Sequence, residues 1–116
     1  MTVYVDDVRH KFRHMTMCHL WADTLPELLA MARRIGVQPK WLQQPPKASW
    51  VHFDISLGKK ELARKYGAVL TDKYGPVEFL AKLDIASGDR ERMIYGQAKL
   101  QQVEAARALR SGGEVT

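Results

Sequence analysis

The sequence has almost no cysteine, and it lacks long apolar runs and several familiar binding motifs. Cys18 is the only cysteine, which excludes an internal disulfide and a multi-thiolate zinc site. No apolar run approaches the roughly 18 residues of a membrane-spanning helix, so no membrane association is expected. A signal peptide, a glycine-rich phosphate loop and a dinucleotide fingerprint are also absent. We therefore expect a cytoplasmic protein.

Positive charge is concentrated in the first part of the chain. The 116 residues carry a formal net charge of +5. Residues 1–70 contain eleven Lys and Arg against six Asp and Glu, whereas residues 71–116 contain seven of each. Excess positive charge in one part of a protein favours anionic partners, namely nucleotides, nucleic acid or an acidic protein surface. Ordinary soluble domains also reach this net charge, so the composition leaves both interpretations open.

The apolar pattern predicts an α/β fold with a small three- to four-stranded sheet, flanking helices and a C-terminal helical extension. The α/β domain is expected over residues 1–72 and the extension over residues 73–116. Thr24 and Glu27 form a capping box for a helix that Gly36 ends, and Ser56 can cap a second helix. Strands are expected over 3–5, 15–22, 50–55 and 68–70, with a polar basic loop over 8–14. The last helix, from about residue 90 to 109, either packs on its own core or forms a homodimer.

Six His and Asp side chains lie at or near the expected strands of the first domain: Asp6, Asp7, His19, Asp23, His52 and Asp54. His52 and Asp54 are two residues apart, so they point the same way on an extended segment. We expect a catalytic centre of Asp6, Asp7, His19, His52 and Asp54. A divalent metal, if one binds, would be held by Asp6, His52 and Asp54. The alternative is that the histidines are structural and hydrogen-bond to the backbone, and that Asp6, Asp23 and Asp54 form turns or helix caps.

The basic segment between the first two strands is the second candidate feature. Arg9, Lys11 and Arg13 are expected to bind phosphate oxygens, and Phe12 could stack on a base. The alternative is a solvated surface loop. Four more cations, Lys59, Lys60, Arg64 and Lys65, lie on the second predicted helix, where a solvent-facing surface is the simpler explanation. For Cys18, an inert buried thiol is favoured over a nucleophile.

Several short motifs resemble domain-of-unknown-function family 4031, a group of short bacterial and phage proteins. The resemblance covers residues 1–70 and ends before the tail that begins near Asp72. It implies a bacterial or phage-encoded cytoplasmic protein, and it assigns no activity to any residue. The motifs that carry it are Val3-Tyr4-Val5-Asp6-Asp7, Cys18-His19-Leu20 with Ala22-Asp23, Glu27-Leu28, Ile35-Gly36, Trp41, His52-Phe53-Asp54-Ile55 and Gly67-Ala68.

The sequence thus favours a phosphate-handling protein, specifically a metal-dependent phosphoesterase acting on a nucleotide or nucleic acid. Two alternatives remain open. One is a non-catalytic module that binds nucleic acid or an acidic protein. The other is a regulator that sequesters a nucleotide without turnover.

Overall fold

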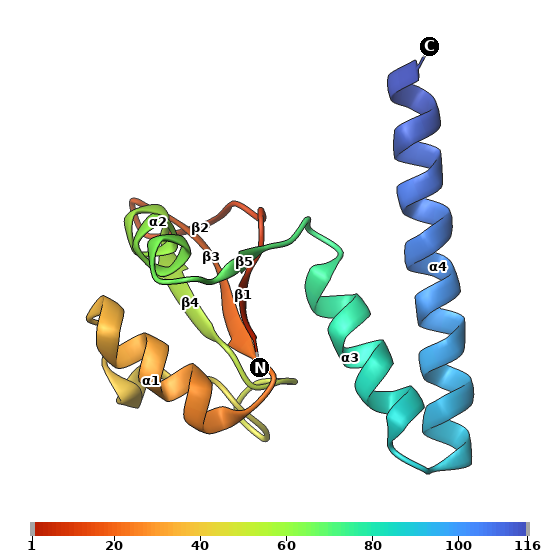
Figure 1. The fold of residues 1–116 in the computed structure, drawn as a ribbon, viewed down its shortest axis with the longest axis horizontal. Coiled ribbons are helices and arrows are strands. Elements are labelled where there is room, and N and C mark those ends of the chain that lie inside the picture. Colours follow the sequence, from red (N-terminus) through yellow and green to blue (C-terminus); the bar gives the residue numbers. More distant parts are fainter. Residues whose placement is uncertain (1, 116) are drawn as a thin grey trace. The chain divides into compact units, whose positions relative to one another are not determined.

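The computed structural model describes the backbone of residues 2–115 and the side chains through Arg110. The chain divides into two compact units, Met1–Lys73 and Tyr74–Thr116. The first unit is an α/β unit with a mixed five-stranded sheet, and the second is helical (Figure 1). In chain order the elements are β1 Val3–Val5, β2 His10–Phe12, β3 Met15–Ala22, α1 Leu25–Ile35, the 3-10 turn η1 Pro39–Trp41, β4 Phe53–Ser56, α2 Leu57–Lys65, β5 Val69–Leu70, α3 Gly75–Ala86 and α4 Arg90–Val115.

Strand β3 is the centre of the sheet because it pairs with three other strands. Its second half is antiparallel to β1, with Val3 opposite Ala22, and its first half is antiparallel to β2, with His10 opposite Met17. The middle of β3 pairs with β4, whose register overlaps both of those pairings. Strand β4 therefore occupies one edge of β3, and β1 and β2 share the other. Strand β5 completes the sheet by pairing parallel to β1.

The predicted basic loop over residues 8–14 is wrong in its central part, because His10–Phe12 is strand β2. A tight turn at Arg13 and His14 joins β2 to β3, and Arg13 adopts a positive φ of 56°. Backbone pairing with Met15–Met17 thus outweighs the polar composition of this segment. This hairpin strand accounts for a five-stranded sheet where three or four strands were expected. The expected strand over 50–55 is shorter in the structure and begins at Phe53.

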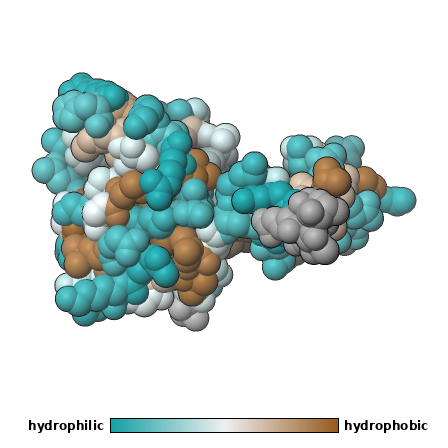
Figure 2. All heavy atoms as spheres, turned by 90° about the horizontal axis from the view of Figure 1, so that it is seen from above, coloured by the Kyte–Doolittle hydropathy of each residue, from teal (hydrophilic) through white to brown (hydrophobic). Residues whose placement is uncertain are grey.

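Helices α1 and α2 cover one face of the sheet (Figure 1). Successive side chains of β3 point to opposite faces of the sheet. Cys18 and Leu20 therefore pack in the core under the helices, whereas His19 projects from the opposite face. On the face that Figure 2 shows, apolar side chains form separate patches among polar ones. The core consists of Val5, Cys18, Leu20, Ala22, Leu28, Met31, Ala32, Ile35, Phe53, Ile55, Ala63 and Ala68.

The predicted helix ends of the α/β unit are confirmed. The Thr24 hydroxyl accepts from the Glu27 amide and donates to the Glu27 carboxylate, which is the capping box. Gly36 ends α1 in the left-handed conformation at φ 83°. The Ser56 hydroxyl accepts from the Lys59 amide at the start of α2, so the last residue of β4 is also the helix cap.

The helical unit is a hairpin of α3 and α4, in which Glu78 of α3 forms an ion pair with Arg107 of α4 at 2.6 Å. The two helices approach closely at Gly96, where a Cβ would lie 2.6 Å from the Ala81 carbonyl oxygen. On α4, Ile94 and Leu109 are exposed, and the homodimer expected from the sequence stays a prediction. Within the described residues, no helix has the length and apolarity needed to cross a membrane.

Candidate metal centre

Three side chains on the sheet face opposite the helices converge on one point. His19 of β3 and Asp54 of β4 are direct cross-strand partners, and His52 precedes Asp54 by two residues. The His19 Nε2 and His52 Nε2 atoms lie 3.8 and 3.5 Å from Asp54 Oδ1. One ligand atom from each residue lies within 4.8 Å of the other two. Since a metal bonded at roughly 2.0–2.2 Å holds its ligands about 3–4 Å apart, these side chains can surround one ion.

Asp6 lies behind His19 and fixes its orientation. The Asp6 side chain is fully buried, and its Oδ2 atom is 2.7 Å from His19 Nδ1. Its other oxygen accepts from the backbone amides of His19 at 3.0 Å and Val8 at 3.4 Å. Both carboxylate oxygens are therefore occupied by protein donors. The geometry makes Asp6 the group that orients the His19 ring, as carboxylates commonly do behind metal-binding histidines, whereas the sequence suggested a direct metal ligand.

The hydrogen-bond partners assign one proton position in each of the two rings. A carboxylate and a backbone carbonyl only accept, so His19 Nδ1 donates to Asp6 and His52 Nδ1 donates to the Trp50 carbonyl at 3.1 Å. In the neutral rings both Nε2 atoms then carry lone pairs. These lone pairs and the Asp54 carboxylate are three acceptors facing one another. Such a group is satisfied by a cation, either protons on the rings or a bound metal.

Two further polar side chains meet Asp54, and sequence reasoning missed both. His10 Nε2 lies 3.8 Å from Asp54 Oδ1, and Gln43 Nε2 donates to Asp54 Oδ2. His10 reaches the cluster because β2 pairs with β3 in a register that places it opposite Met17, on the same face as His19. Gln43 reaches it because its backbone pairs with that of His52. A hairpin interpretation of residues 9–17 would have found His10, whereas no sequence signal identifies Gln43.

An aromatic wall, formed by Tyr4, Trp21 and Trp50, encloses one side of the cluster. Trp50 stacks on His52 at a centroid distance of 4.2 Å and packs edge-on against Trp21 at 5.6 Å. Tyr4 stacks on Trp21 at 5.5 Å. This wall shields the His52 ring, which is buried, and limits its rotation. The His52 ring is thereby held in one orientation by its aromatic neighbours.

The electrostatics of the cluster favour charge separation between the rings and the carboxylates. Burial opposes protonation of His19, but its hydrogen bond to Asp6 and the charges of Asp6 and Asp54 outweigh burial and raise the pKa of His19. Burial also opposes ionisation of Asp54. Hydrogen bonds from His52 and Gln43, together with nearby histidine charge, nevertheless lower the pKa of Asp54. Both shifts stabilise an imidazolium beside a carboxylate when no metal is bound.

We expect the stability of the metal-free protein to fall as the pH rises past neutrality. Because the pKa of His19 is raised in the folded state above its ordinary value of 6.5, its contribution is complete below that pH. The contribution is lost as the pH rises through the folded pKa. Asp54, whose pKa is lowered from 3.8, loses its contribution only in more acidic solution. Urea unfolding with a chelator, from about pH 6 to pH 9, measures this slope. His19→Gln should flatten it, and an unchanged slope would contradict the assignment.

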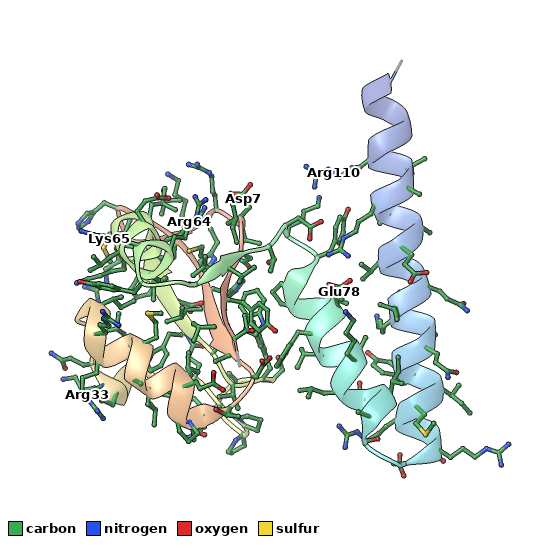
Figure 3. All side chains as sticks on the ribbon, viewed as in Figure 1. Asp7, Arg33, Arg64, Lys65, Glu78 and Arg110 are labelled. Carbon is green, nitrogen blue, oxygen red and sulfur yellow. The ribbon has the colours of Figure 1, made fainter. Side chains whose placement is uncertain are left out.

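The structure places the remaining predicted residues away from the cluster. Asp7 is exposed (Figure 3), and its carboxylate pairs with Lys60 of α2 at 3.1 Å. Asp23 accepts from the Tyr4 hydroxyl and the Thr2 amide, both at 2.9 Å, and so joins the ends of β1 and β3. The buried Cys18 thiol has its pKa raised to about 12 by burial and by the Asp6 charge, so no thiolate forms near neutral pH.

The three expected phosphate-binding residues do not form one group. Lys11 alternates with His10 in β2 and donates to the Thr16 hydroxyl at 3.2 Å, so it leaves the sheet on the face opposite His10. Arg9 is exposed before β2, and Arg13 lies over the Phe12 ring at 5.5 Å. On α2, Lys60 is buried against Asp7, and Lys59 donates to the Ile35 carbonyl at 2.7 Å. Arg64 and Lys65 extend into solvent (Figure 3).

A cavity of about 400 Å³ opens beside the cluster on the same face of the sheet. We call it the Met–aromatic cavity. Asp54 belongs to both the cluster and this cavity, so a ligand in the cavity would touch the candidate metal centre. Its lining is formed by His10, Phe12, Met15, Met17, Val37, Trp41, Gln43 and Asp54.

Comparison with known proteins identifies a family. No curated protein and no solved structure matches the chain. The family described as "Protein of unknown function (DUF4031)" matches residues 3–83, which include the whole His–Asp cluster and extend into α3. The match extends past residue 70, where the resemblance carried by the sequence motifs ends, and it covers well over half of the chain. The chain therefore belongs to the DUF4031 family.

Proposed function

We propose that the protein is a metal-dependent phosphoesterase that acts on a nucleotide or nucleic acid. His19, His52 and Asp54 hold the metal in this proposal. One observation carries it: the Nε2 atoms of the two histidines and Oδ1 of Asp54 face one another, while the Nδ1 protons are used by Asp6 and the Trp50 carbonyl. A cation is the species that satisfies three converging acceptors.

The donor set itself favours a catalytic ion over a structural one. Structural zinc sites usually have four protein ligands, whereas two histidines and one carboxylate occur at catalytic zinc and at iron(II) centres. Three ligands leave coordination positions for water and substrate. A divalent metal supplies a Lewis acid for the phosphoryl oxygen and lowers the pKa of water toward neutrality. The Met–aromatic cavity lies on the side from which a substrate could approach Asp54.

His10 is placed to move the proton that hydrolysis requires. Hydrolysis joins the oxygen of water to phosphorus, breaks the bond to the leaving alcohol, and transfers one proton from the water to that alcohol. His10 Nε2 is 3.8 Å from Asp54 Oδ1, and its side chain lines the cavity. We propose that the His10 ring accepts this proton from the water and passes it to the leaving alcohol, because an imidazole nitrogen can both accept and donate a proton.

Cationic side chains beside the cavity support a phosphate-bearing substrate. Arg13 lies over Phe12 at 5.5 Å, and Lys40 lies over Trp41 at 5.3 Å. Phe12 and Trp41 both line the cavity, so a cation accompanies each aromatic ring. Arginine and lysine at such positions attract phosphate oxygens.

The first test is metal binding together with turnover by the purified full chain. The protein is stripped with a chelator and titrated with Zn²⁺, Mn²⁺, Co²⁺ and, without oxygen, Fe²⁺. Bis-p-nitrophenyl phosphate then serves as a generic phosphodiester. We expect one metal to bind in a 1:1 ratio and to restore hydrolysis that the chelator abolishes. His52→Ala should lose both properties. His14→Ala is the matched control, because His14 is an exposed histidine in the β2–β3 turn.

The outcomes separate the proposal from its alternatives. Metal binding without hydrolysis of any phosphoester would favour a sequestering regulator. Failure of every metal to bind would overturn the proposal and leave the cluster as a structural hydrogen-bond network. Binding to nucleic acid that weakens steeply with salt and ignores the chelator would indicate a non-catalytic module.

A further inference from the structure

We infer that the Met–aromatic cavity binds the base of a nucleotide and presents its phosphate to the metal centre. This inference rests on the proposed function and names its substrate class as nucleoside phosphates. The cavity volume, about 400 Å³, lies within the roughly 300–1,000 Å³ of small-molecule sites. Nucleic acid strands are the competing substrate class, and the experiment below distinguishes them.

The cavity wall is apolar although much of it faces water. Trp41 is 62% exposed, Phe12 54% and Met15 41%. All three line the cavity together with Met17. Large apolar side chains gathered on one concave surface mark binding sites more often than isolated exposed ones do. The cavity also lies on the sheet face that carries His19, opposite the helices, so these side chains are not required by the core.

The side chains that line the Met–aromatic cavity suit a flat aromatic ring that is attached to an anionic group. Phe12 and Trp41 offer ring faces for stacking, which accepts any base because every base has a π-face. Met15 and Met17 add polarizable thioethers, which make favourable contacts at the edges of aromatic rings. The guanidinium of Arg13 and the ammonium of Lys40 lie over the two aromatic rings. The cavity wall therefore combines stacking surfaces for a base with the positive charge that attracts an anionic ligand.

The polar end of the cavity connects it to the metal centre. His10, Gln43 and Asp54 are the polar residues of the lining. Asp54 Oδ1 faces His19 and His52 in the cluster, and Asp54 Oδ2 accepts from Gln43. A nucleotide that fills the apolar part thus has its sugar and phosphate directed toward the proposed metal ligands. An extended nucleic acid strand, in contrast, would not need a cavity for one base.

Metal-free binding tests this inference separately from catalysis. The chelator-treated full chain is titrated calorimetrically with the four nucleoside 5′-monophosphates, with ribose 5-phosphate, with inorganic phosphate and with a short single-stranded oligonucleotide. We expect at least one nucleotide to bind roughly 10-fold more tightly than ribose 5-phosphate, because base stacking supplies about that factor. Trp41→Ala should remove the difference. Tyr95→Ala is the matched control, since Tyr95 on α4 is 58% exposed and has Lys99 over its ring at 5.5 Å.

Each result decides between the two proposals. Equal affinity for nucleotides and ribose 5-phosphate would overturn the cavity inference, even if bis-p-nitrophenyl phosphate is hydrolysed. An oligonucleotide that binds far more tightly than every mononucleotide would overturn it in favour of a strand. Full nucleotide affinity in Trp41→Ala would also overturn it. Nucleotide binding that depends on Trp41, without metal-dependent hydrolysis, would sustain the cavity and refute the phosphoesterase.

Discussion

Replacing Asp54 by Asn is expected to abolish metal binding and turnover while leaving the metal-free protein about as stable as the wild type. Asp54 is the one anion among the three proposed ligands, and its Oδ1 atom lies 3.5 Å from His52 Nε2 and 3.8 Å from His19 Nε2. Asn removes the charge that attracts the ion. The loss should exceed the roughly 10–100-fold that removal of an outer partner costs.

The same substitution relieves a conflict in the metal-free protein. When both rings are neutral, His19 and His52 direct lone pairs at the Asp54 carboxylate, and these three acceptors then lack a proton to share. In Asp54→Asn, the new side-chain amide would donate to one of these Nε2 atoms, while its oxygen still accepts from Gln43. The loss of function should therefore come without a loss of stability, as is common where a site is built for a ligand.

Cobalt(II) titration and chemical unfolding measure these two effects on one preparation. Asp89→Asn is the control, because Asp89 caps α4 by accepting from the Arg92 amide at 2.9 Å, and Asn caps a helix equally well. The control should keep full metal affinity. If Asp54→Asn instead unfolds the protein, Asp54 is a structural residue and the metal centre is refuted. If it binds metal normally, the ligand assignment is wrong.

The helices of the α/β unit were predictable because their signals are local. The Thr24 and Glu27 capping box, the Gly36 stop and the Ser56 cap each involve residues within four positions, and each is confirmed. Strand β2 was not predictable from composition. Its residues, His10–Phe12, are polar and basic outside the one Phe, and they become a strand only by pairing with Met15–Met17. Pairing of this kind depends on register, which composition does not encode.

The same distinction between local signals and strand register explains which parts of the candidate site could be predicted. His52 and Asp54 share a face because they are two residues apart, so their proximity could be predicted. The cross-strand pairing of His19 with Asp54 adds the third side chain of the cluster, and it depends on the register of β3 against β4. Asp6 and Asp7 are adjacent in sequence yet have different surroundings. Asp6 is fully buried behind His19, whereas Asp7 pairs with Lys60. Sequence alone could not assign their separate roles.

Two substitutions of Asp6 are expected to rank in opposite orders for stability and for metal affinity. Asp6→Ala leaves the His19 amide without its acceptor and removes the carboxylate from His19 Nδ1. Breaking a buried, charged hydrogen-bond network of this kind costs about 3–5 kcal/mol of folding free energy. Asp6→Asn should cost less, because its carbonyl oxygen can still accept from the His19 and Val8 amides.

For metal affinity the Asn variant should be the worse of the two. Its amide nitrogen would occupy the position of Oδ2, 2.7 Å from His19 Nδ1. An amide nitrogen only donates, so Nδ1 must accept, and the ring proton moves to Nε2. That proton then points at Asp54 and removes the lone pair which the metal needs, the same tautomer error that disables a catalytic histidine when its aspartate becomes asparagine. In Asp6→Ala, no neighbouring donor forces the proton onto Nε2, so the His19 ring can still adopt the tautomer with the proton on Nδ1.

Urea unfolding and cobalt(II) titration give the two rankings, and ¹⁵N chemical shifts of the His19 ring report the tautomer directly. We expect stability to decrease from wild type to Asn to Ala, and metal affinity to decrease from wild type to Ala to Asn. If Asp6 only supported the fold, metal affinity would follow stability, and Asp6→Ala would be the weaker binder. A reversed ranking therefore requires that Asp6 acts on the metal through the proton of His19, because no loss of packing could harm the better-folded variant more.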